Sequence, residues 1–216
     1  MALPGQNTPL CRLVPINMRD DDEFEELQRQ RLRCGYASDD ATLNDWRKAT
    51  EAGTKVIFWI CCASQAEGDG TRGDIVGHIA LNSQTDPPDP RLAKADKSVL
   101  YMSTFFVFQE RQRQGIGRAA LSLLEEEAVR EPYGSPMCKA ITADTLSKKY
   151  TDWDGPQWRG LWPRLGLPKP PKGTSTEIWY NKLGWETWAD EPKLNLELGD
   201  GSKVMVNLAL LKRRLQ

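Results

Sequence analysis

Two glycines and three arginines crowd the segment from residue 111 to 118, which reads Arg-Gln-Arg-Gln-Gly-Ile-Gly-Arg. Residues 99–108 before it are rich in bulky strand formers, and residues 118–130 after it place alanine and leucine on one helical face. A strand that ends in a glycine turn and opens into a helix directs several free backbone N–H groups at one point. The segment therefore predicts a phosphate or pyrophosphate site, to which the arginines add charge-assisted hydrogen bonds.

Two common nucleotide motifs do not fit this turn. A dinucleotide-binding fingerprint needs a third glycine where the chain has Ala120. A Walker P-loop needs a Gly-Lys-Ser/Thr sequence, which the segment lacks. On these residues alone, an ordinary helix N-terminus with glycines in the preceding turn, and no ligand, stays an open alternative.

Few other residues suggest acid–base chemistry. His78 is the single histidine and lies in the apolar run 75–79, and Asp144 stands near the exit of a predicted strand. Each has a structural alternative, as a satisfied core histidine and as a cap of the following loop. The five cysteines have no Cys-x-x-Cys spacing, so they predict packing thiols in a reduced protein and no metal centre.

The length and the pattern of apolar residues predict a single α/β domain over residues 1–216. The 39% hydrophobic content suffices for a core. We expect strands at 11–16, 56–63, 74–83, 99–108, 140–146, 185–189 and 203–211, and helices at 20–33, 38–48, 118–130 and 174–183. Ser38 is the expected N-cap of the second helix. An insertion at about 147–173 is rich in proline and tryptophan.

The charge balance points away from two classes of partner. A net charge of −1 gives no overall field toward nucleic acid or anionic lipid. The longest apolar run, 56–63, is too short to span a bilayer, and no signal peptide is visible. We therefore expect a cytoplasmic protein with no nucleic-acid or membrane partner.

Two segments resemble a known family. Gln112–Gly117 is similar to the Gln/Arg-x-x-Gly-x-Gly/Ala signature of the GNAT superfamily of acetyltransferases, at the family's position between the long fourth strand and the next helix. Trp179–Trp185 resembles the family's aromatic-Tyr-x-x-x-Gly-aromatic segment. The resemblance implies an α/β GNAT fold, with a mixed, mostly antiparallel sheet of six or seven strands flanked by helices and splayed between strands four and five.

The resemblance also implies a reaction, the transfer of an acetyl group from acetyl-CoA to a primary amine, with CoA as product. Tyr180 then corresponds to the general acid, while His78 or Asp144 would be the base, acting through water bound by Ser103 and Thr104. The residues expected to bind the cofactor are Phe106, Val107, Phe108, Gln112, Arg113, Gln114, Gly115, Ile116, Gly117, Arg118, Ser175 and Tyr180.

The sequence departs from the family pattern at two places. Gly173 stands where the family often has a cofactor-binding asparagine, and Ser175 or Thr174 would substitute for it. The connection at 147–173 is unusually long, and we expect it to line the acceptor pocket, with packing on the outer sheet face or on a second subunit as the alternative. Substrate contacts are expected from Tyr36, Trp158 and Trp162.

The aromatic insertion and the lack of an appended recognition domain favour a small-molecule amine as acceptor. A protein or peptide acceptor stays open, as does a catalytically silent CoA-binding sensor. We expect a monomer or a homodimer.

Overall fold

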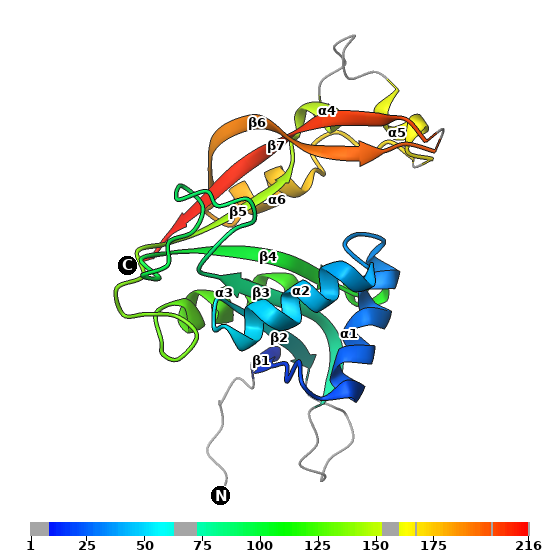
Figure 1. The fold of residues 1–216 in the computed structure, drawn as a ribbon. Coiled ribbons are helices and arrows are strands. Elements are labelled where there is room, and N and C mark those ends of the chain that lie inside the picture. Colours follow the sequence, from blue (N-terminus) through cyan, green and yellow to red (C-terminus); the bar gives the residue numbers. More distant parts are fainter. Residues whose placement is uncertain (1–8, 63–72, 153–159, 167, 200, 216) are drawn as a thin grey trace, which may run out of the picture. The chain divides into compact units, whose positions relative to one another are not determined.

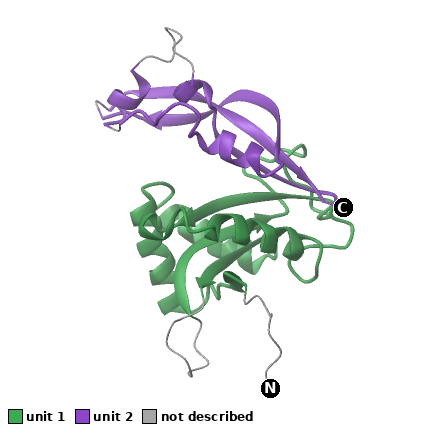
Figure 2. Ribbon diagram, turned by 180° about the vertical axis from the view of Figure 1, so that it is seen from behind, with its two compact units in different colours: residues 1–138 green, residues 139–216 purple. Residues whose placement is uncertain are grey.

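The computed structural model describes residues 9–62, 73–152, 160–166, 168–199 and 201–215 (Figure 1). The chain divides into two compact units, residues 1–138 and residues 139–216 (Figure 2). The single domain expected over 1–216 stays a prediction, and each unit is described by itself.

Unit 1 contains an antiparallel sheet in the order β1-β2-β3-β4. Its strands are β1 (Cys11–Pro15), β2 (Lys55–Cys62), β3 (Asp74–Asn82) and β4 (Val99–Val107). The pairing of β3 with β4 passes from His78↔Phe106 to Ala80↔Ser103, so that two residues of β4 oppose one residue of β3. One of the two, Thr104, has a φ of 53°. This β-bulge changes the direction of the side chains along β4.

The α-helices that the structure describes in unit 1 are α1 (Asp21–Cys34), α2 (Asp40–Glu51) and α3 (Ile116–Ala128). Leu27 of α1 and Leu43 of α2 are fully buried in one cluster with Ile57 and Trp59 of β2. Burial of these side chains, each contributing about 1.5–3 kcal/mol, fixes α1 and α2 on that face of the sheet. The N-cap prediction for Ser38 is wrong, because Asp39 accepts the hydrogen bond from the Thr42 N–H at 2.8 Å.

Unit 2 contains an antiparallel sheet in the order β5-β7-β6. Its strands are β5 (Ala140–Leu146), β6 (Glu186–Glu197) and β7 (Lys203–Arg214). Its helices are α4 (Lys149–Asp152), α5 (Leu161–Arg164) and α6 (Thr176–Lys182). The predicted strand at 185–189 is much too short, since β6 runs on to Glu197 in a long hairpin with β7.

The described part of the insertion packs on this hairpin. Tyr150 and Leu161 form a small core with Leu198 and Val206. The Trp162 Nε1–H donates to the Tyr150 carbonyl at 2.8 Å, and the Tyr150 hydroxyl accepts from the Asn207 N–H at 2.7 Å. The insertion thus covers apolar side chains of β6 and β7 and explains why the hairpin extends so far.

The α/β class predicted from the sequence is confirmed, and all the strand pairs within each unit are antiparallel. Among the helices that the structure describes, none has the length and apolar character needed to cross a membrane.

Candidate functional site

The predicted phosphate-binding segment, Gln112–Gly117, is called the phosphate turn. It follows β4 and a short 3-10 helix, η1 (Gln109–Arg111). The Gln112 side chain donates from Nε2 to the Val107 carbonyl at 2.9 Å and so ties the turn to the end of the strand. Arg113 has a φ of 62° and Gly115 a φ of 84°. Left-handed residues at these positions turn successive N–H groups inward, which is the geometry of an anion-binding nest.

Helix α3 begins directly at this turn, at Ile116 rather than at the predicted residue 118. Its N-cap, Gly115, supplies no side-chain hydrogen bond. The first-turn N–H groups of an α-helix, here those of Ile116, Gly117 and Arg118, have no carbonyl acceptor within the helix. They are therefore free to donate to a phosphate, and the turn fits the pyrophosphate of a CoA-type cofactor.

The three arginines beside the turn differ in their surroundings. Arg111 lies 3.6 Å from Asp74 in an ion pair. Arg113 and Arg118 are exposed, and neither takes part in an ion pair with any residue that the structure describes. These two side chains are the better placed to neutralise a phosphate.

The end of β4 is held rigidly. The Phe108 N–H donates to the Val76 carbonyl at 2.9 Å, and Val107 pairs with Gly77. A Cβ at Gly77 would lie only 2.1 Å from the Phe106 carbonyl oxygen, so only glycine permits this close approach of β3 and β4. The predicted cofactor residues Phe106, Val107 and Phe108 thus belong to a well-fixed strand end.

Tyr180, the predicted general acid, lies on α6 in unit 2 and is 5% exposed. Its ring centre lies 4.9 Å from that of Trp179 and 5.4 Å from that of Trp185. Burial, together with the negative charge of Asp144, raises the pKa of Tyr180 above its usual value. The phenol therefore stays protonated at neutral pH, as a proton donor must.

Asp144, one of the two predicted bases, lies on β5, and its Oδ2 is 3.7 Å from the Lys193 Nζ. Ser175 caps α6, and its Oγ accepts a hydrogen bond from the Ile178 N–H at 3.3 Å. The cap occupies one lone pair of the hydroxyl that was expected to contact the cofactor. Both roles stay predictions.

His78, the other predicted base, is fully buried on β3. Its Nδ1 lies 2.8 Å from Gln30 Oε1 and its Nε2 lies 3.3 Å from Arg31 Nη1. Since the amide oxygen only accepts and the guanidinium only donates, the proton belongs on Nδ1 and the Nε2 lone pair is already used. Burial and the charges of Arg31 and Lys55 lower the pKa of His78 to about 3.

A second group of polar side chains lies beside His78, and Ser103 is its one member that the sequence predicts as part of the site. Lys55 Nζ lies 2.9 Å from Asn82 Oδ1 and 3.1 Å from Ser103 Oγ, and the lysine is 8% exposed. In the sequence, Lys55 and Asn82 stand at the ends of apolar runs, where polar residues usually face water. Only strand pairing brings them onto the buried face.

The predicted substrate residues have different outcomes. Tyr36 follows α1 and is 57% exposed, and its backbone carbonyl accepts a hydrogen bond from the Arg31 guanidinium. Trp162 lies on α5 against Tyr150. Trp158 lies outside the described residues. The substrate contacts of all three stay predictions.

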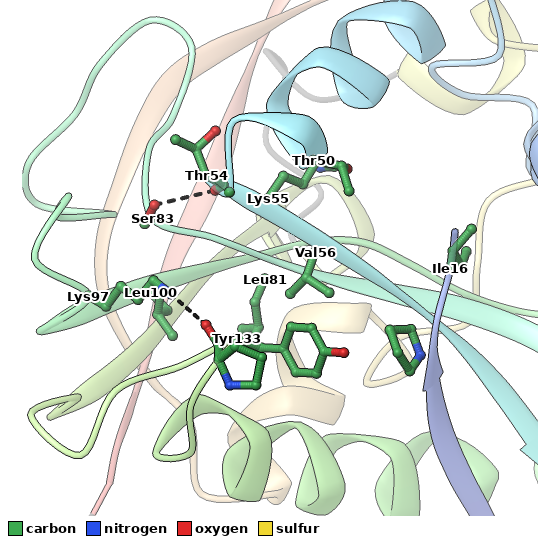
Figure 3. A pocket seen from close by; sticks show the side chains of 13 residues that line it. Ile16, Thr50, Thr54, Lys55, Val56, Leu81, Ser83, Lys97, Leu100 and Tyr133 are labelled. Carbon is green, nitrogen blue, oxygen red and sulfur yellow. Dashed lines mark hydrogen bonds between the residues drawn. The ribbon is translucent and has the colours of Figure 1, made fainter. Parts of the chain in front are cut away.

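Unit 1 also has a cavity of about 310 Å³, which the sequence does not predict (Figure 3). Val56, Leu81 and Tyr133 form part of its apolar wall, and Lys55 and Lys97 lie among its polar lining residues. No residue of the phosphate turn lines it. Among the described residues, no group of His, Cys, Asp or Glu is arranged to hold a metal ion.

Comparison with solved structures identifies the fold. An aminoglycoside 6'-N-acetyltransferase complexed with coenzyme A matches with a TM-score of 0.59 at 12% identity, over 94% of this chain and 97% of that one. Arabidopsis thaliana NAA60 in complex with acetyl-CoA matches with a TM-score of 0.57 at 13% identity, over 95% and 98%. Spermidine N-acetyltransferase from Vibrio cholerae, a dodecamer, matches with a TM-score of 0.57 at 6% identity, over 96% and 95%.

A search of curated protein sequences finds no match. The model of the acetyltransferase (GNAT) family matches residues 21–147, more than half of the chain, and this range includes α1, α2, β4 and the complete phosphate turn. The chain therefore belongs to the GNAT family of acetyltransferases.

Proposed function

We propose that this protein transfers the acetyl group of acetyl-CoA to a primary amine of a small molecule, by direct attack of the amine in a ternary complex. The observation that carries the proposal is the phosphate turn, in a chain whose family is established. Gly115 and the free N–H groups of α3 would hold the pyrophosphate, with Arg113 and Arg118 beside them. Bound acetyl-CoA supplies an activated thioester carbonyl.

Each step of the transfer makes a demand on the protein. The backbone of Phe106, Val107 and Phe108 would orient the pantetheine arm, which reduces the entropy cost of bringing amine and thioester together. Tyr180 would donate its proton to the leaving sulfur. Its burial and its raised pKa support this role, because both keep the phenol protonated until the thiolate forms.

The proton of the acceptor ammonium requires a base. His78 is poorly suited because its Nε2 lone pair already accepts a hydrogen bond from Arg31. Asp144 keeps a partly exposed carboxylate, and its negative charge acts on Tyr180. We propose Asp144 as the better of the two predicted bases. A water molecule between the carboxylate and the amine would carry the proton.

A thiol-release assay with a panel of amines tests the proposal. The panel contains small primary amines, a polyamine, an aminoglycoside and peptides with a free N-terminus. Turnover of small amines is the expected result. Turnover of peptides alone would instead identify a protein or peptide acetyltransferase, and binding of acetyl-CoA without turnover of any acceptor would identify a sensor.

A further inference from the structure

A buried amine, that of Lys55, lies on the face of the unit 1 sheet that packs against α1 and α2. The elements around Lys55 each contribute a neighbour, and β3 contributes Asn82 as well as His78. Arg31 comes from α1, the Trp46 ring from α2 at 4.6 Å from Nζ, His78 from β3 and Ser103 from β4. Of these groups only Arg31 carries a charge, because His78 is neutral.

No carboxylate among the residues that the structure describes pairs with Lys55 or with Arg31. A charged lysine in such surroundings is costly, since burial penalises the ion and the nearby guanidinium repels it. Both effects lower the pKa of Lys55 to about 7. A large fraction of the amine is therefore neutral at neutral pH and has a lone pair.

The hydrogen bonds around Lys55 give that lone pair a defined partner. Asn82 Nδ2 donates to Ser103 Oγ at 2.9 Å and to the Tyr101 carbonyl at 2.9 Å, which fixes the orientation of the amide. Asn82 Oδ1 then accepts from Lys55 Nζ. When Lys55 is neutral, the Ser103 hydroxyl donates to its lone pair, and a lone pair of Ser103 Oγ is left to accept a proton from a further donor.

Ser103 occupies a suitable place on β4. It precedes the bulge at Thr104, on the strand whose later residues, from Phe106 on, are proposed to orient the pantetheine arm. The hydroxyl of Thr104 is buried and has no hydrogen-bond partner among the described residues. Thr104 thus places a second hydroxyl, with unused hydrogen-bonding capacity, next to Ser103 on this strand.

We propose that Lys55, acting through Ser103, is the base in place of Asp144 and accepts the proton that the acceptor ammonium must lose before it attacks the acetyl carbonyl. The inference rests on the proposed function. Ser103 Oγ takes the proton from the ammonium, directly or through one water, as its own proton passes to Lys55 Nζ. The acceptor becomes a neutral amine, Lys55 becomes an ammonium, and it later returns the proton to solvent.

The pH dependence of kcat/KM in the full-length protein tests this inference. The value of kcat/KM is expected to rise with pH and to level off above the pKa of Lys55, about 7; this rising part of the pH profile is called the limb. Two acceptors whose ammonium groups have different pKa values are compared, because a limb that belongs to the enzyme stays in place when the acceptor changes. The Lys55→Met variant is expected to show no such limb. Its kcat is expected to fall by about 10²-fold, the lower end of the range for acid–base catalysis.

Two further variants separate the relay from a structural role. Ser103→Ala keeps the amine but breaks the relay, and it is expected to lose a similar factor in kcat while acetyl-CoA binding is unchanged. Lys48→Met removes an exposed lysine on α2 that pairs with Asp45 at 2.8 Å, and it is expected to behave as wild type. Retention of the limb and of kcat in either Lys55→Met or Ser103→Ala overturns the inference.

A second measurement does not depend on turnover. The ¹⁵N signal of the Lys55 side chain, assigned by its loss in Lys55→Met, is expected to titrate near 7. Titration in the normal range of lysine, about 10.4, overturns the inference while the proposed function stands. If the wild type binds acetyl-CoA but acetylates no amine, the proposed function fails, and the relay fails with it.

Discussion

The Nε2 atom of His78 accepts a hydrogen bond from Arg31 Nη1 at 3.3 Å, which fixes the histidine in one neutral tautomer. The guanidinium also donates to the carbonyls of Tyr36 and Ala37, so one buried side chain orients both β3 and the segment after α1. We therefore expect His78 to hold the position of this segment and to contribute to pH dependence through folding.

The first prediction concerns stability in acid. Unfolded His78 binds a proton below its ordinary pKa of 6.5, whereas the folded residue does so only near pH 3. The unfolded state thus binds more protons between these values, and the free energy of unfolding falls as the pH is lowered through them. His78→Gln is expected to reduce this fall by at most about 1.4 kcal/mol per pH unit. Denaturant titrations of both proteins across this range measure it, and identical slopes would contradict the prediction.

The second prediction concerns the leaving group. Tyr180→Phe is expected to lower kcat by about 10²-fold or more, since general-acid catalysis typically contributes 10²–10⁴-fold. Acetyl-CoA affinity should change little, because the rings around Tyr180 keep their packing partner. Tyr150→Phe is the matched control, as its hydroxyl accepts a backbone hydrogen bond from Asn207 on the hairpin. Full activity of Tyr180→Phe would contradict the prediction and show that Tyr180 serves only as an aromatic side chain of the core.

The third prediction concerns the phosphate turn. Gly115 has a φ of 84°, where a side chain costs about 1–2 kcal/mol. Gly115→Ala is expected to distort the N–H groups at the start of α3 and to weaken acetyl-CoA binding by roughly tenfold, equivalent to about 1.4 kcal/mol. Isothermal titration calorimetry measures the affinity. Gly201→Ala carries a similar strain at a φ of 77°, outside the turn, and should leave the affinity unchanged. Equal affinity in both variants and the wild type would refute the role of the turn.

The fourth prediction concerns the insertion. If the segment at 147–173 lines the acceptor pocket, Trp162→Ala and Trp158→Ala raise the acceptor KM while the KM for acetyl-CoA is kept. Trp188→Ala, a change at a tryptophan on β6 that is 37% exposed, is the control. Steady-state kinetics and circular dichroism on the same preparations separate binding from folding. An unchanged acceptor KM in folded protein would leave the insertion with the structural role of covering the hairpin.

The local parts of the fold and of the site could be predicted from the sequence. The helices α1 and α3 follow from the spacing of their apolar residues, and the phosphate turn from two glycines at a strand end, because these properties depend on neighbours along the chain. The length of β6 could not be predicted. Beyond Ala189 the polar pair Asp190-Glu191 and Pro192 argue against a strand, yet pairing with β7 continues through them to Glu197, where the insertion packs on the hairpin.

By itself, the sequence determined the donor side of this protein, since a phosphate-binding turn needs only a few consecutive residues with the right backbone freedom. Tertiary structure decided the ionisation of its buried groups. Lys55 and Ser103 are 48 positions apart in the sequence, and strand pairing places Lys55 Nζ 3.1 Å from Ser103 Oγ. Whether a lysine or a histidine carries a charge depends on burial and on nearby ions, and both are set by the packing of distant segments.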